Sequence, residues 1–251
     1  SEKAWRHGAQ SDGSHMFLGL GSQVSVEDLI RGMVIVSAND ACIALAEGLA
    51  GSEEAFVDLM NRRAQALGLK SARFRNVTGL PDPEHVISSL DLARLTAHIV
   101  REFPELYRLY SERSLTYAGK TQPNRNPLLS GFQGADGAKT GHTNASGYGL
   151  VGSALLNGQR RIIVFNGLPT MAARASEANR LMRAAFFDFE ARRVFEKGAK
   201  VGEAQRFLGG RKSVALVTPE PIYFAAHRSA AAAVTANIVY QGPLPAPETQ
   251  G

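Results

Sequence analysis

Apolar residues recur at intervals of three and four positions in several stretches of the first hundred residues, which is the spacing of one buried helix face. Between these stretches stand residues that begin or end helices, because Ser, Asn and Asp side chains accept hydrogen bonds from free N–H groups and glycine closes the last turn. The pattern predicts helices that start after Ser25, at Ala41 with Asn39 or Asp40 as the cap, after Ser52, and at Ser88 or Ser89, with ends near Gly51, Gly68 and Pro104.

The pattern changes from helical to alternating after about residue 111. The stretch SLTYAGKTQPNRNPLL is typical of short strands and turns. YGLVGSALLNGQRRIIVFNG places two alternating apolar runs around Asn157-Gly158, a pair preferred in type I′ turns, and so predicts a β-hairpin. A last helix is predicted over residues 173–192, with Phe186 and Phe189 on the face that covers this sheet.

Beyond about Val194 the chain consists of short strand-like pieces separated by turns: KVGEAQRFLGG, SVALVTP, PIYFAA and ANIVYQG. We therefore divide the chain into residues 1–193 and a small β-rich domain over residues 194–251. The predicted fold class is α/β (α+β), with helices packed on an antiparallel sheet and a β-rich module after it.

Composition narrows the possible functions. With 44% hydrophobic and 20% charged residues, the 251-residue chain can bury a core. Its net charge of +5 comes from scattered Lys and Arg, so nucleic-acid binding is not expected. The single cysteine, Cys42, excludes an internal disulfide and a multi-cysteine metal site, and we expect it to be a small buried residue. No metal or other cofactor is predicted.

Two polar stretches stand out against this background. Ser37-Ala38-Asn39-Asp40 lies between two apolar segments, as the floor of a binding site would. In GADGAKTGHTNASGYGL, Lys139 and Thr140 offer a cation and a hydroxyl to a carboxylate or an oxyanion, and Gly141 lets a second backbone approach the strand.

Ser-x-Asn followed by Lys-Thr-Gly is the order of motifs in serine acyl-transfer enzymes of the penicillin-binding type. The chain resembles the low-molecular-mass D-alanyl-D-alanine carboxypeptidases, and the resemblance runs through SQVSVEDLIRGMVIVSANDACIALAE, GSEEAFVDLMNRRAQALGLKSARFRNVTGL, TQPNRNPLL and DGAKTGHTNASGYGLVGSA. The part after Val194 resembles the second domain of these enzymes. The resemblance implies the β-lactamase/transpeptidase-like fold.

The resemblance also implies roles for individual residues. Ser37 relays a proton, Asn39 holds the catalytic lysine and the substrate amide, and Lys139 with Thr140 and Gly141 forms the opposite wall, which binds the terminal carboxylate. Each residue also has a simpler interpretation, with Ser37 near a helix end, Asn39 as a helix cap and Lys139 as a surface lysine.

His142, Arg174 and Arg125 match further family positions that line the cleft. The alternatives are a histidine at the end of a strand, an Arg174–Glu177 pair along one helix, and an Arg125 that braces a turn.

The family nucleophile is the serine of Ser-x-x-Lys, and no serine of this sequence has lysine three positions later. We consider three explanations for the missing Ser-x-x-Lys motif. The chain is a fragment or cleavage piece, the protein has lost catalysis and kept binding, or another serine acts as the nucleophile. We favour the fragment, with the N-terminal part of the fold missing and the β-rich module incomplete.

For the intact protein the resemblance implies removal of the terminal D-Ala from peptidoglycan pentapeptides through a serine acyl-enzyme that β-lactams also acylate. It implies an extracytoplasmic, periplasmic location at the inner membrane, with peripheral membrane association through a C-terminal segment not present here. The alternatives are a serine β-lactamase, for which the isolated Glu84 is a poor candidate base, and a non-catalytic cell-wall peptide-binding module.

Overall fold

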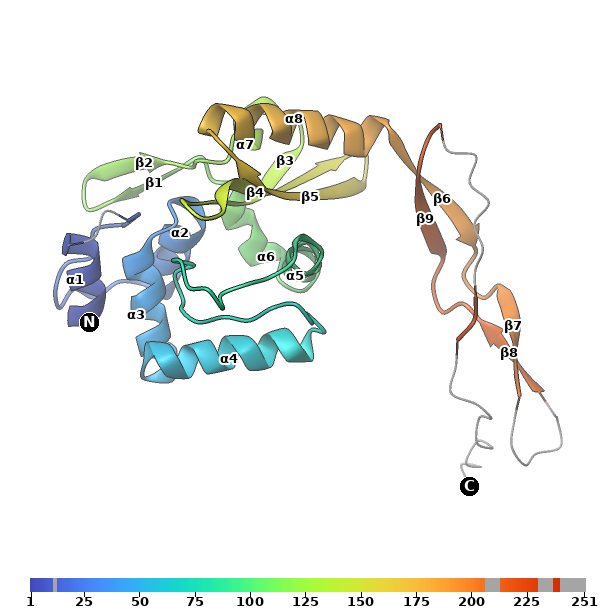
Figure 1. Cartoon of the computed structure of the whole chain (residues 1–251), viewed down its shortest axis with the longest axis horizontal. Coiled ribbons are helices and arrows are strands. Elements are labelled where there is room, and N and C mark those ends of the chain that lie inside the picture. The colour runs from blue at the N-terminus through green and yellow to red at the C-terminus, as the bar shows by residue number, and fades with distance from the viewer. Residues whose placement is uncertain (11–12, 206–212, 230–236, 240–251) are drawn as a thin grey trace, which may run out of the picture. The chain divides into compact units, whose positions relative to one another are not determined.

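The computed structural model describes residues 1–10, 13–205, 213–229 and 237–239, which form two compact units, Ser1–Met182 and Arg183–Gly251. The first unit contains the helices, apart from the last turn of the final helix, together with the three-stranded sheet and a small hairpin, and the second contains two two-stranded sheets among its described residues (Figure 1). Among the helices of these residues, none is long and apolar enough to cross a membrane.

The N-terminal helices begin and end where local capping signals stand. Ser25, Ser52 and Ser88 each accept a hydrogen bond from a backbone N–H in the first turn of the helix that follows. Gly51 ends its helix with a φ of 82°, a conformation that costs glycine little. These ends confirm the predicted positions. The helices of this part are α1 (Glu2–Gln10), α2 (Val26–Ile35), α3 (Asn39–Ala50), α4 (Glu53–Ala66), α5 (Ser89–Glu102), α6 (Pro104–Tyr107) and the 3-10 helix η1 (Arg108–Ser111).

The predicted cap of α3 is wrong. Neither Asn39 nor Asp40 caps the helix, because α3 already begins at Asn39 and its cap residue is Ala38, which makes no side-chain cap bond. The Asp40 side chain is fully buried and accepts hydrogen bonds from the backbone N–H groups of Met16, Leu18 and Ala41. A carboxylate taken out of water needs such partners, so Asp40 fastens the segment before α2 to the start of α3.

The main sheet has the order β3-β4-β5, all antiparallel, with β3 (Ala135–Thr143), β4 (Gly147–Leu156) and β5 (Gln159–Leu168). Asn157 and Gly158 connect β4 to β5 with φ values of 52° and 72°, which confirms the predicted hairpin, because a type I′ turn needs positive φ at both central residues. A smaller hairpin, β1 (Ser114–Tyr117) with β2 (Lys120–Pro123), and the short helix α7 (Leu128–Gly131) precede the sheet.

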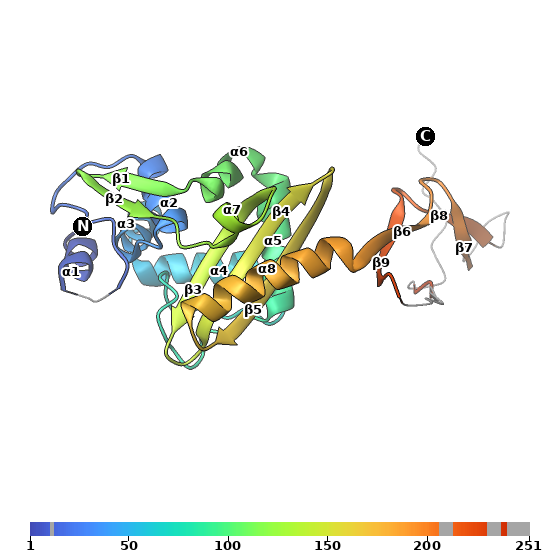
Figure 2. The same ribbon diagram turned by 90° about the horizontal axis from the view of Figure 1, so that it is seen from above.

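Helix α8 (Met171–Phe187) lies across one face of the sheet, while α5 and α6 lie on the other (Figures 1 and 2). Buried Ala178 and Met182 belong to α8, so the prediction that the last helix covers the sheet is confirmed. A second buried cluster joins α2 and α3 to η1 and β1 through residues such as Val36, Leu45, Leu109 and Leu115.

The predicted end of the last helix, at residue 192, is wrong. Helix α8 stops at Phe187, and β6 (Phe189–Phe195) begins two positions later. Phe189, expected on the buried helix face, is 41% exposed. The cause is a distant partner: β6 pairs antiparallel with β9 (Ile222–His227), which supplies the ladder hydrogen bonds that a helix would otherwise make.

The second unit also holds β7 (Lys200–Gln205) paired with β8 (Ser213–Val217). The pieces predicted from SVALVTP and PIYFAA correspond to β8 and β9. Most of ANIVYQG, and the end of KVGEAQRFLGG, lie outside the described residues. Because β6 belongs to this unit, the division between the units falls before the expected 193/194 boundary.

Candidate functional site

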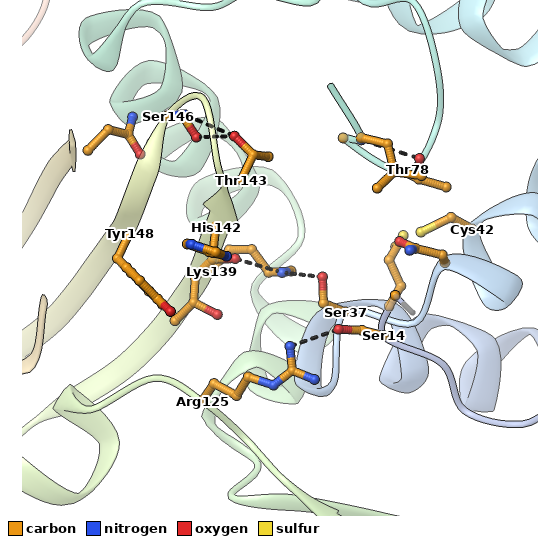
Figure 3. A pocket seen from close by; sticks show the side chains of 18 of the residues that line it. Ser14, Ser37, Cys42, Thr78, Arg125, Lys139, His142, Thr143, Ser146 and Tyr148 are labelled. Carbon is orange, nitrogen blue, oxygen red and sulfur yellow. Dashed lines mark hydrogen bonds between the residues drawn. The ribbon is translucent and has the colours of Figure 1, made fainter. Parts of the chain in front are cut away.

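A cavity of about 790 Å³ lies in the first unit between the loop joining α2 to α3 and the strand β3 (Figure 3). Every residue predicted for the site lines it: Ser37, Asn39, Arg125, Lys139, Thr140, Gly141, His142 and Arg174. The fold therefore brings together side chains that are separated by more than one hundred positions in the sequence.

The loop wall, which we define as Ser37 and Asn39, lies where the chain turns sharply from α2 into α3, with Asn39 as the first residue of α3. Ser37 has a φ of 61°, a left-handed conformation that a residue with a Cβ adopts at a cost. Asn39 is buried, its backbone N–H donates to Ser14 O at 2.8 Å, and its side chain makes no hydrogen bond within the described residues. Its amide is thus available to the cavity.

The strand wall, which we define as Lys139, Thr140, Gly141 and His142, comes from β3. The Nζ of Lys139 donates to Ser37 Oγ at 2.9 Å and to Thr140 O at 2.9 Å, so the two walls are joined at one point. Burial lowers the pKa of Lys139 from 10.5 to about 8, and the positive charges of Arg125 and Arg174 act in the same direction. A lysine in this state can give up a proton near neutral pH.

Two arginines complete the cationic side of the cavity. Arg174, in the first turn of α8, is only 5% exposed. Its Nη2 donates to Arg125 O at 3.3 Å, and its Nε has no acceptor among the described residues. The predicted alternative, a pair with Glu177, is wrong, because that carboxylate binds Arg180 instead. Burial lowers the pKa of Arg174, as expected for a cation without a counter-charge.

Arg125 reaches the cavity from the segment between β2 and α7, and its Nη1 donates to Ser14 Oγ at 2.8 Å. The contact connects it to the segment that Asp40 holds in place, 111 positions away in the sequence. The Arg125 guanidinium therefore does not simply brace its own turn, which was the alternative interpretation.

The lining also contains residues that were not predicted, among them Tyr148 and a loop that follows α4. Tyr148 on β4 stacks on His142, with ring centroids 3.9 Å apart. The loop Val77–Leu80 forms the side opposite the strand wall, and Asn76 fixes it by accepting from Thr78 and Gly79 and donating to Leu80 O. In the sequence, Asn76 is followed three positions later by Gly79, and this pattern is typical of a turn.

The charge of the lining has one sign. Among the described residues around the cavity are Arg125, Lys139 and Arg174, and no Asp or Glu. Glu84 does not line the cavity and pairs with Arg73 and Arg75. Such a site favours an anionic ligand, and the unused donors of Arg174 and Asn39 fit a carboxylate.

Cys42 lines the cavity, whereas Asp136 does not. Cys42 was expected to be buried and is half-buried. Desolvation raises the pKa of its thiol to about 11, which makes it unreactive near neutral pH. Asp136 forms a two-bond ion pair with Arg160, at 2.8 and 2.7 Å, away from the cavity lining. Across the described residues, no three His, Cys, Asp or Glu side chains gather as a metal ion would require.

Comparison with known proteins gives the same picture over most of the chain. Residues 1–169 match the family described as "D-alanyl-D-alanine carboxypeptidase", and residues 189–251 match "Penicillin-binding protein 5, C-terminal domain". D-alanyl-D-alanine carboxypeptidase DacA of Haemophilus influenzae is 42% identical over 217 residues, which are 86% of this chain and 55% of that protein. DacD of Escherichia coli K12 is also 42% identical, over 84% of this chain and 54% of its own length.

Solved structures of penicillin-binding proteins are also similar to this chain. Penicillin binding protein 5 from Haemophilus influenzae superimposes with a TM-score of 0.82 and 39% identity, covering 98% of this chain and 72% of that one. Penicillin-binding protein D2 from Listeria monocytogenes, in the ampicillin-bound form, gives 0.64 and 31% identity, over 70% of this chain and 74% of the other. The chain spans about 55% of the length of the DacA relative that it matches.

Proposed function

The chain belongs to the D-alanyl-D-alanine carboxypeptidase family, and on this premise we propose that the whole protein removes the terminal D-alanine from peptidoglycan stem pentapeptides. One observation carries the proposal: the hydrogen bond from Lys139 Nζ to Ser37 Oγ, 2.9 Å long, in a cavity whose charged lining is basic throughout the described residues. A site of this kind can bind a carboxylate and move a proton next to it.

The terminal carboxylate of the peptide binds on the cationic side. Thr140 offers a hydroxyl, and Arg174 offers guanidinium donors that the described residues leave largely unused. A planar guanidinium can donate two parallel hydrogen bonds to one carboxylate, which fixes its direction as well as its position. Arg125, held by Ser14, adds a further positive charge to the lining.

Lys139 and Ser37, which join the two walls, transfer the proton. With the pKa of Lys139 lowered to about 8, the amine exchanges its proton with the Ser37 hydroxyl over a distance suited to general acid–base catalysis. Ser37 passes that proton toward the amine of the departing D-alanine. Asn39 donates its side-chain amide to the peptide carbonyl next to the reacting bond.

The covalent step belongs to a serine in a Ser-x-x-Lys segment, which the 251 residues do not include. In the whole protein its hydroxyl oxygen attacks the carbonyl carbon of the penultimate D-alanine, and the carbon–nitrogen bond to the last D-alanine breaks. Water then hydrolyses the ester and restores the hydroxyl. β-Lactams acylate the same serine, and the ampicillin-bound form of the Listeria relative supports this part of the proposal.

We also propose that the protein acts outside the cytoplasm, at the outer face of the inner membrane, because the proposed substrate is peptidoglycan. This location, and peripheral association with that membrane, are parts of the proposal that rest on the family. Nucleic acid has no part in it. A serine β-lactamase is the less favoured alternative, because fast deacylation needs a carboxylate base and none lines the cavity among the described residues.

The test compares the chain alone with the chain joined to the Ser-x-x-Lys segment of the DacA relative. Intact mass after incubation with penicillin G and release of D-alanine from a pentapeptide are measured on both. We expect no adduct on the chain alone, and one persistent penicilloyl group together with D-alanine release on the joined protein. Lys139→Met should abolish both activities, whereas the matched change at exposed Lys70 should leave them unchanged.

Other outcomes separate the alternatives. Rapid penicillin hydrolysis without a lasting adduct would identify a β-lactamase. A folded joined protein that binds the peptide and shows neither adduct nor release would identify a binding module. An adduct on the chain alone would show that one of its own serines is activated, contrary to the proposal.

A further inference from the structure

Tyr148 contacts two residues of the cavity lining that come from different elements. Its ring stacks on His142 of β3, with centroids 3.9 Å apart and an interplanar angle of 28°. The guanidinium carbon of Arg174, from α8, lies 5.6 Å from the centre of the same ring. Figure 3 shows the Tyr148 and His142 side chains lying alongside each other at the cavity.

The backbone around Tyr148 explains this position. In the register of β3 and β4, Tyr148 stands directly opposite His142, which brings the two rings together on one face of the sheet. On the other side, the pairing of β4 with β5 shifts by a bulge between Tyr148 and Leu150. Bulges of this kind turn a side chain toward a new direction and are common beside functional sites.

The glycines on both sides of Tyr148 allow β5 to come close. A Cβ at Gly149 would lie 1.8 Å from Asn166 Oδ1, and a Cβ at Gly147 would lie 2.9 Å from Leu168 O. A side chain at Gly149 would displace the Asn166 side chain, and one at Gly147 would press on the backbone of β5. The GYG sequence therefore fixes one strand geometry, and Tyr148 is the side chain that this geometry presents to the cavity.

Arg174 has little else to orient its guanidinium plane. It is only 5% exposed. Within the described residues its Nε has no acceptor, and its side chain makes one hydrogen bond, to Arg125 O, which is long at 3.3 Å. No Asp or Glu in the described lining of the cavity is available to pair with it. An aromatic face attracts a guanidinium, most strongly where water is excluded.

We propose that Tyr148 is a positioning residue whose ring holds Arg174 and His142 in the arrangement that distinguishes a free terminal carboxylate from a neutral carboxamide. The proposal rests on the proposed function, because it assumes that the carboxylate of a D-alanyl-D-alanine peptide binds beside Arg174. The ring, and not the phenolic hydroxyl, is the part that acts. Tyr148 itself need not touch the substrate.

The experiment measures, by titration calorimetry on the full chain, the affinity for diacetyl-L-lysyl-D-alanyl-D-alanine and for its C-terminal carboxamide. The unmodified chain should bind the acid at least tenfold more tightly than the amide, since a charge-assisted hydrogen bond is lost with the amide. Tyr148→Leu should lower this ratio about fivefold, mainly through the acid, because the cation–π contact is lost. Tyr148→Phe keeps the ring and should stay within about twofold of the unmodified chain.

Two controls keep the outcome clear. Tyr148→Thr is a second variant without a ring, with a β-branched side chain suited to a strand, in case Tyr148→Leu does not fold. Tyr223→Leu removes an exposed tyrosine of β9 and should not change the ratio. If a folded variant without the ring keeps the acid-to-amide affinity ratio of the unmodified chain, the inference is wrong and the proposed function stands. The same holds if Tyr148→Phe lowers the ratio as much as Tyr148→Leu does. Equal affinity of the unmodified chain for acid and amide overturns the proposed function, and the inference with it.

Discussion

The two walls of the cavity are held in place by different physical means. The loop wall depends on hydrogen bonds to a buried carboxylate, since Asp40 fastens the segment of Met16 and Leu18 to the start of α3 directly behind Ser37 and Asn39. The strand wall depends on sheet register and on ring stacking between His142 and Tyr148. Substitutions that disturb the loop wall should therefore lower the stability of the protein. Substitutions that disturb the strand wall should mainly shift its side chains out of alignment.

Asp40 gives the largest expected effect. Asp40→Ala leaves the buried N–H of Met16 and the half-buried N–H of Leu18 without an acceptor, and we expect a loss of about 3–5 kcal/mol in the free energy of unfolding. Urea denaturation followed by circular dichroism measures it. The matched change at exposed Asp58 should stay within about 0.5 kcal/mol. Equal effects at the two positions would show that the loop wall is not held by Asp40.

Lys139 should link stability to pH where the walls meet. Its pKa is about 8 in the folded state, against an ordinary value of 10.5 for a solvated lysine, so the folded protein binds fewer protons than the unfolded chain between these values. Stability should therefore rise with pH through this window, by about 3 kcal/mol, and the penalty should be present in full below it.

The measurement is the unfolding free energy at pH 7.5 and at pH 10.5, compared with that of Lys139→Met. Both proteins carry Cys42→Ala, because the raised pKa of that thiol acts in the opposite direction at high pH. A difference between the two proteins that does not change with pH would mean that the amine is not desolvated in the cavity.

Ser37 gives the smallest effect and tests the backbone of the loop wall. Glycine and alanine both remove the hydroxyl that accepts from Lys139, but only glycine adopts a φ of 61° without steric cost. Ser37→Gly should thus be more stable than Ser37→Ala by about 1 kcal/mol in thermal or urea unfolding. At Ser114 in β1 the order should reverse, by about 0.5 kcal/mol, because glycine weakens strands.

Local signals made much of the fold predictable. Ser52 and Ser88 cap helices through bonds to residues three positions away, and Asn157-Gly158 sets its hairpin through its own φ values. Long-range pairing was not predictable in this way. Residues 189–195 have a helix-compatible composition and became a strand because β9, more than 25 residues later, supplies the partner.

The same distinction holds for the site. Ser37, Asn39 and Lys139 were found because their motifs are short and their order is informative. Asp40 was taken for a cap, since its backbone partners lie 22 and 24 positions earlier and leave no periodic signal. Tyr148 was assigned to a plain strand, because alternation along a sequence does not indicate where a bulge will turn a side chain.

The basic lining of the cavity has a consequence for the state without substrate. Three like charges in a confined space concentrate small mobile anions from the surrounding solution, so the site is electrically compensated before any peptide arrives. Peptide binding is then an exchange, in which a carboxylate takes the place of a counterion that returns to solution. The apparent affinity will depend on which anion the buffer contains and at what ionic strength, with phosphate competing more strongly than chloride.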